Sequence, residues 1–334
     1  MYVNRQIGFP VIFFFSKFYL LKSLLLASAV YVGYEYFGLK FLEIPFIPIA
    51  TIGTAVAFYV GFKNHASYER LWEARKIWGA ITNISRSWAI SVVSLVRDRK
   101  GDVGTCLRMI RRHLCWVNAL RIQLRRGTTC SGDADSKLTH VKLVHIHQPP
   151  ICYDTEMKTT LERFIEPGER EALEKCSNVA SNVLKEQLKE LTALKDDGVI
   201  DGFEHNSMQN LIYQCFDQQG AAERIKSFPF PRQYAHFSML FVTIFNYLLP
   251  FGLIGELARA EHSLTWLMIP FTILISWIFL TMELVGDSSE DPFVTGLNDV
   301  PISAISINIE RDLLEIMDEA ELPAKLEPVN HILL

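Results

Sequence analysis

The side chains best suited to metal binding are three histidines near the middle of the chain, His140, His145 and His147. His145 and His147 could share one face of a short strand over residues 139–147, and neutral imidazole is a common zinc ligand. No cysteine or carboxylate lies at ligand spacing beside them, so a surface strand is favoured over a metal centre. We therefore predict neither a metal site nor a cofactor.

The chain also lacks the short motifs of common enzyme classes. It contains no G-x-S-x-G, no P-loop and no H-E-x-x-H, so nucleotide hydrolysis and standard hydrolase chemistry have no support. None of the six cysteines forms a C-x-x-C pair, which indicates free thiols in a reducing compartment. The formal net charge of −4 gives no reason to expect nucleic acid as a partner. The sequence predicts a protein that is not an enzyme.

A basic helix in the polar middle region is a candidate for anion binding. It could hold anions in a vestibule, contact anionic lipid, or form a solvated face, and the last interpretation is favoured. Its arginines are Arg108, Arg111, Arg112, Arg121, Arg125 and Arg126.

A different stripe of residues could guide ions. Thr54, Phe58 and Phe62 stand at positions i, i+4 and i+8, so they line one face of a helix. Periodicity alone favours simple packing between helices, because many small residues surround these three and allow close approach in a membrane. The helix is nevertheless too polar and too rich in small residues to face lipid on all sides. This favours a pore-lining face.

Four stretches are apolar and long enough to span a bilayer as helices. They cover about residues 18–37, 45–62, 237–257 and 264–284. The first could be a signal peptide with a cleavage site at Ala27-Ser28-Ala29, but Lys17 and Lys22 interrupt its apolar run and the run continues further. We therefore expect a retained membrane helix.

Basic residues indicate how the chain is oriented. Arg70 and Arg75 follow the second span, and Arg224 and Arg232 precede the third, whereas the short loops on the other side carry little positive charge. The positive-inside rule places the polar middle region and both termini in the cytoplasm of a cell with the chain in its inner membrane. The expected units are residues 1–62 with two spans, 63–235 as a cytosolic helical region, 236–286 with two spans, and 287–334 as a cytosolic tail.

Several short motifs follow one another along the chain. The first is the run 61–86, and the later ones are Glu223-Arg224-Ile225, Pro229-Phe230-Pro231, Tyr234-Ala235-His236, Pro250-Phe251-Gly252, Glu290-Asp291-Pro292-Phe293 and Asn298-Asp299-Val300-Pro301. In this order they resemble the motifs of the bestrophin family, in its bacterial branch. The stretch 101–198 matches only in helical character.

The resemblance implies an all-α membrane protein that assembles as a homopentamer around one central pore. Its second membrane helix would line a narrow neck with Thr54, Phe58 and Phe62. Family members mostly pass anions, although a bacterial relative with aliphatic neck residues looks cation-selective. Phenylalanine edges carry the positive part of the ring quadrupole and favour anions. Thr54 replaces the usual aliphatic residue, and its hydroxyl should ease wetting of the neck.

The resemblance also implies a second constriction just before the helix 208–219, where Ile200 or Phe203 is the candidate. A buried loop residue is an equally good interpretation of either one. Animal members of the family hold calcium on an acidic cluster, of which only Asp299 remains here. Calcium prefers about six to eight oxygen ligands, so we predict no tight calcium site. Glu290, Asp291 and Asp299 are expected to cap helices or bond to neighbouring subunits.

Two function classes fit these observations. One is a passive channel for chloride and other monovalent anions, with a monovalent-cation channel as its variant. The other is a membrane scaffold that conducts nothing. A coupled transporter is less favoured, because the charged residues of the spans lie toward their ends.

Overall fold

The computed structural model describes residues 1–4, 9–97, 103–126, 153–228, 230–293, 298–329 and 331–334. Within these ranges the regular structure is helical, apart from isolated antiparallel bridges near the chain ends, so the predicted all-α class is confirmed. The strand expected over 139–147, with its three histidines, lies outside the described residues. In chain order the helices are α1 (Phe9–Glu35), η1 (Lys40–Leu42), α2 (Phe46–Ser91), η2 (Val92–Arg97), α4 (Val103–Leu124), α5 (Tyr153–Phe164), α6 (Pro167–Glu174), α7 (Val179–Asp196), α8 (Gly202–Ser227), α9 (Arg232–Ala260), η4 (His262–Leu267), α10 (Met268–Ser288) and α11 (Ile302–Ile316).

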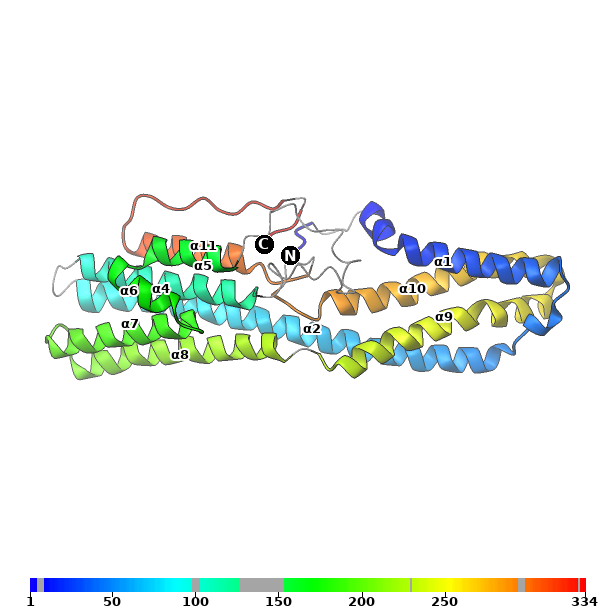
Figure 1. Cartoon of the computed structure of the whole chain (residues 1–334), viewed down its shortest axis with the longest axis horizontal. Coiled ribbons are helices and arrows are strands. Elements are labelled where there is room, and N and C mark those ends of the chain that lie inside the picture. Colours follow the sequence, from blue (N-terminus) through cyan, green and yellow to red (C-terminus); the bar gives the residue numbers. More distant parts are fainter. Residues whose placement is uncertain (5–8, 98–102, 127–152, 229, 294–297, 330) are drawn as a thin grey trace.

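The helices form two bundles placed end to end in an elongated molecule (Figure 1). At one end α1, α9 and α10 pack with the N-terminal half of α2. At the other end α8 and α11 pack on the C-terminal half of α2, and α4, α5, α6 and α7 complete the bundle. Among the described helices, α2 alone runs through both bundles.

The length of α2 follows from its sequence. Pro48 lies in its first turn, where a missing backbone N–H is tolerated, and no proline follows before Ser91. Its 46 residues, at a rise of about 1.5 Å each, make a rod about 70 Å long. The predicted continuation of the second span into the polar region is thereby confirmed as one unbroken helix.

Three described helical segments are long and apolar enough to cross a membrane, namely Lys40–Val96, Arg232–Ala260 and His262–Ser288. They contain the second, third and fourth predicted spans. The first predicted span lies in α1, whose apolar sequence is interrupted by Lys17 and Lys22. This helix packs along α9 and α10, beside the apolar segments.

Small residues allow α2 and α9 to approach closely. A Cβ atom added at Gly53 would come within 2.7 Å of the Phe245 ring. Around this contact Val56 and Val60 of α2 pack with Val242 of α9 in one buried cluster. Such close approach of helix backbones is typical of packing in membranes.

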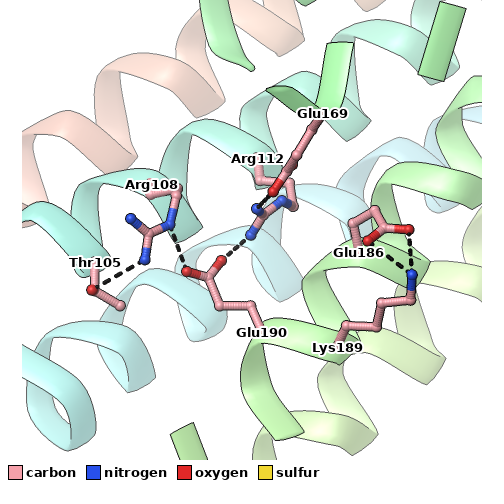
Figure 2. Close-up of polar contacts among 7 residues, drawn as sticks. All are labelled: Thr105, Arg108, Arg112, Glu169, Glu186, Lys189 and Glu190. Carbon is pink, nitrogen blue, oxygen red and sulfur yellow. Dashed lines mark hydrogen bonds and ion pairs between the residues drawn. The ribbon is translucent and has the colours of Figure 1, made fainter. Parts of the chain in front are cut away.

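A buried arginine organises the second bundle (Figure 2). Arg112 of α4 is only 3% exposed and forms ion pairs with Glu169 of α6, at 2.7 Å, and with Glu190 of α7. Arg108 pairs with the same Glu190 carboxylate at 2.7 Å. Because each buried charge meets an opposite charge, the bundle interior tolerates them.

The two ends of the chain lie side by side, near the junction of the bundles (Figure 1). Tyr2 and Ile332 form an antiparallel bridge. The Ala304 amide, in the first turn of α11, donates a 2.7 Å hydrogen bond to the Leu334 carbonyl. This contact satisfies one of the amides that a helix start leaves without an intrahelical partner.

Candidate functional site

The three predicted neck residues lie on one exposed stripe of α2, which we call the neck stripe (Thr54, Phe58 and Phe62). In the single chain Phe58 is 70% exposed and Phe62 is 60% exposed, and Thr54 is exposed as well. The opposite face of the same helix is buried against α9 and α10 through Val56 and Val60. Large apolar side chains left bare in this way require a cover, which is either lipid or another protein surface.

The two phenylalanines are packed against each other. Their ring centroids lie 4.6 Å apart with the ring planes at 88°, so the edge of one ring meets the face of the other. This arrangement is the favoured one for an aromatic pair, because a positive edge contacts a negative face. The pair therefore presents both ring edge and ring face to the space in front of α2.

Thr54 has its hydroxyl proton already engaged. Its Oγ1 atom donates a 3.0 Å hydrogen bond to the carbonyl of Ala50, one turn earlier in α2. What Thr54 offers to the space in front of the stripe is therefore an oxygen acceptor, not a donor. Water can donate to this oxygen, whereas an anion gains no hydrogen bond from it.

A buried charge cluster lies directly behind the neck stripe. Lys63, the residue after Phe62, is 2% exposed and donates a 2.5 Å hydrogen bond to Glu283 of α10. Lys63 also pairs with Asp287 of α10, and the Ser238 hydroxyl of α9 donates to the second Glu283 oxygen at 2.6 Å. The cluster ties α2, α9 and α10 together at the level of Phe62.

Sequence reasoning did not identify this cluster. From the sequence alone, Lys63 is one more basic residue after the second span, and Glu283 is a charge near the end of the fourth. One signal was available in the sequence: both ionisable residues lie at the C-terminal ends of apolar stretches. Ionisable residues in such positions of a membrane protein usually pair with an opposite charge. Their separation of 220 residues gave no hint that they pair with each other.

The two candidates for a second constriction lie in contrasting environments. Ile200 is 2% exposed and belongs to the core of the second bundle, whereas Phe203 is 89% exposed. Phe203 stands in the first turn of α8, which Asp201 and Glu204 stabilise through a capping box. Of these two candidates, only Phe203 has a side chain that is accessible from outside the single chain.

The acidic residues after α10 make contacts inside the chain. The Glu290 carbonyl accepts a 2.9 Å hydrogen bond from Arg70, and the Asp291 carboxylate pairs with Lys226 at 2.8 Å. Asp299 is buried. No group of three or more potential metal ligands occurs among the residues that the structure describes; residues 294–297 and the three predicted histidines lie outside them.

The arginines of the predicted basic helix, which lie in α4 and directly after it, do not form one solvated face. That interpretation is wrong for the arginines that pair with carboxylates. Arg112 is buried between two carboxylates, and the Arg121 side chain is 11% exposed and pairs with Glu156 at 2.8 Å. Arg111 and Arg126 are exposed as expected. The difference arises because α5, α6 and α7 bring carboxylates onto the basic side of α4, which helical periodicity alone does not reveal.

Comparison with known proteins shows both a matching family model and similar sequences. A family model described as "Bacterial/Fungal Bestrophin protein" matches residues 18–315. The voltage-dependent anion channel-forming protein YneE of Salmonella typhi is 30% identical over 284 residues, which cover 84% of this chain and 80% of that protein. The protein of the same name from Escherichia coli strain K12 is 28% identical over 285 residues, covering 85% and 81% of the two chains.

The fold has a solved counterpart. A bacterial bestrophin homologue from Klebsiella pneumoniae superimposes with a TM-score of 0.76 at 24% identity, covering 91% of this chain and 99% of that one. At this identity the likeness concerns the fold. Because the family model covers most of the chain and the Salmonella relative aligns over most of both sequences, this chain belongs to the bacterial and fungal bestrophin family.

Proposed function

We propose that several copies of this chain surround a shared axis and form a passive channel for chloride and other monovalent anions. The single observation that carries the proposal is the neck stripe, with Phe58 70% and Phe62 60% exposed on a helix whose other face is buried. Lipid alone could cover two phenylalanines, as it covers other exposed apolar side chains of these helices. The same bare face also carries the polar Thr54 on a helix rich in small residues, and this favours an assembly of several copies around it. The relatives named as anion channels support the same function.

The proposed assembly is a homopentamer with four spans per subunit, held in a lipid bilayer with α4–α8, α11 and both termini in the cytoplasm. The side-by-side placement of the chain ends is consistent with an even number of crossings. Phe203 is the better of the two candidates for the cytosolic constriction, because Ile200 is already buried inside the protomer.

Anion preference follows from the chemistry of the stripe. Ring edges of Phe58 and Phe62 can turn toward the axis and present the positive part of the quadrupole. No charged side chain lies between Thr54 and Phe62, so the neck selects by ring polarity and by how easily it wets.

One observation favours the cation-selective alternative. Thr54 presents an acceptor oxygen after its proton is donated to Ala50, and oxygen acceptors coordinate cations. The sign of the reversal potential in asymmetric NaCl separates the two. Each subunit contributes two phenylalanine rings but only this one hydroxyl. We therefore expect a reversal potential that indicates chloride selectivity.

The test uses purified protein in liposomes. We expect chloride flux down its gradient without an energy source, and a several-fold higher flux or an altered reversal potential for Phe58→Ala and for Phe62→Ala. Phe271→Ala is the matched control, because Phe271 is an exposed phenylalanine of α10, away from the neck stripe. Wild-type protein without any flux would support the scaffold alternative. Flux that both neck variants leave unchanged would show that the neck lies elsewhere.

A further inference from the structure

The exposed face of α2 does not end at Phe62. Three residues further lies His65, and four residues after that lies Glu69, and both side chains are 69% exposed. The His65 Nε2 atom lies 3.4 Å from a Glu69 carboxylate oxygen. These steps of three and four keep the pair on the same side of the helix as the neck stripe.

The opposite side of α2 at this level is buried. Lys63 is buried and bonded to Glu283 and Asp287 of α10, and Ser67 is buried as well. Among the described residues, Glu69 is the one charged group in contact with His65, since the carboxylates that α10 brings to this level bind Lys63 instead. Within the part of the chain that the structure describes, the two side chains therefore pair with each other and with no other charged group.

Imidazole ordinarily changes charge between about pH 5 and pH 8, whereas a carboxylate normally stays ionised over this range. With His65 neutral, each copy of the pair carries one negative charge. With His65 protonated, the pair is neutral. Copies arranged around an axis would thus form a ring whose charge disappears as the pH falls, directly below a neck that itself has no charge.

We propose that His65 and Glu69 form a second, protonatable selectivity ring for monovalent anions on the α4–α8 side of the neck. The inference rests on the proposed function, because it needs α2 to line an ion path. At high pH the ring of Glu69 carboxylates repels anions and concentrates cations, and protonation of His65 removes that bias. Lower pH on this side therefore raises the chloride-to-sodium permeability ratio.

The experiment is a reversal-potential measurement in a planar bilayer with asymmetric NaCl. The pH is changed from about 8 to about 5.5, the range over which imidazole titrates, only on the side that carries the helical bundle. We expect the permeability ratio to increase on the order of tenfold, the low end of the concentration effects reported for clefts lined by one sign of charge.

Two variants assign the effect to the pair. His65→Asn should hold the ratio at its high-pH value throughout, because the carboxylate ring then has no titrating partner. Glu69→Gln should raise the ratio already at pH 8. His262→Asn is the matched control, because His262 is equally 69% exposed and lies 3.6 Å from the Glu35 carboxylate, but it belongs to η4 and not to α2. This control should keep the full pH response.

The outcomes separate this inference from the proposed function. If Phe58→Ala alters flux but the wild-type permeability ratio does not change with pH, the channel stands and the protonatable ring is refuted. If the pH response persists in His65→Asn, another group produces it and the inference is likewise refuted. If neither the neck variants nor pH has any effect, the proposed function fails together with the inference.

Discussion

Lys63 of α2 and Glu283 of α10 form a buried ion pair, with 2.5 Å between the lysine Nζ and a carboxylate oxygen and no more than 2% of either side chain exposed. The second carboxylate oxygen accepts the Ser238 hydroxyl of α9 at 2.6 Å. Since Lys63 directly follows Phe62, this contact sets how α2 is rotated about its own axis, and hence which of its faces stays bare.

Removing one partner of this pair should be costly. Lys63→Met leaves the Glu283 carboxylate buried without its cation, and such a loss typically lowers the free energy of unfolding by about 3–5 kcal/mol. The double variant Lys63→Met/Glu283→Gln removes both charges and should recover part of that loss. Thermal unfolding in detergent measures both, with Lys76→Met as control because Lys76 is an exposed lysine of the same helix. A double variant as unstable as the single one would contradict the assignment.

Gly53 should tolerate a side chain poorly. A Cβ there would come within 2.7 Å of the Phe245 ring, which is buried and packs against Phe279, so Gly53→Ala must displace this ring or push α9 away from α2, at a typical cost of about 1–3 kcal/mol. Gly61→Ala lies in the same helix and meets nothing within 4 Å in the chain, so it should leave the monomer's stability nearly unchanged. Equal melting temperatures for the two variants would argue against close approach of α2 and α9.

His113 should make the protein less stable in acid. This side chain is fully buried in the second bundle, and burial lowers its pKa from 6.5 to about 3. The unfolded chain therefore takes up a proton below about pH 6.5 while the folded chain does not. The stability that His113 contributes is complete above pH 6.5 and is lost as the pH falls toward 3, by about 1.4 kcal/mol per pH unit.

The neutral form of this histidine can be assigned from its neighbours. Ser85 donates its hydroxyl proton to the Ile81 carbonyl at 2.7 Å, so His113 Nε2 must donate to the Ser85 oxygen, at 2.9 Å. His113→Gln can make the same donation but does not titrate. Melting temperatures measured between about pH 7.5 and pH 5 should therefore fall less steeply for His113→Gln than for the wild type. The control His236→Gln, at an exposed histidine of α9, should keep the wild-type slope.

Thr54 should control how readily the neck wets. Thr54→Val has nearly the same shape but removes the acceptor oxygen, so the neck becomes a run of apolar rings that expels water more easily. We expect lower chloride flux and a reversal potential shifted further toward chloride. Thr243→Val is the control, because Thr243 also donates to its own helix, at 2.7 Å to Met239, but lies in α9. Flux in Thr54→Val equal to or above the wild-type value would contradict this role.

Sequence periodicity was sufficient to predict the features that depend on a single helix. The steps between Thr54, Phe58 and Phe62 predicted a common face, and the absence of a breaker predicted one continuous α2. Periodicity failed where partners come from distant helices. Neither the pairing of Lys63 with Glu283 nor that of Arg112 with Glu190 follows from local spacing, because α6, α7 and α10 must first be placed beside α2 and α4.

Tertiary packing also explains why the two candidates for the second constriction differ in exposure. Ile200 and Phe203 are both large hydrophobic residues three positions apart, and nothing in their types tells them apart. Their exposures of 2% and 89% differ because Ile200 precedes α8 and packs into the bundle core, while the capped first turn of α8 directs Phe203 outward. Burial of this kind depends on tertiary packing.

The continuity of α2 has a mechanical consequence. Ile81, buried in the second bundle, and Phe58 are separated by about 35 Å of unbroken helix, at about 1.5 Å per residue. With no joint between them, a tilt of about 5° at the cytosolic end displaces the aromatic end by about 3 Å, which is the diameter of a water molecule. In the proposed channel the helix would thus act as a lever, through which a small repacking of α8 or α11 would open or shut the neck on the far side of the molecule.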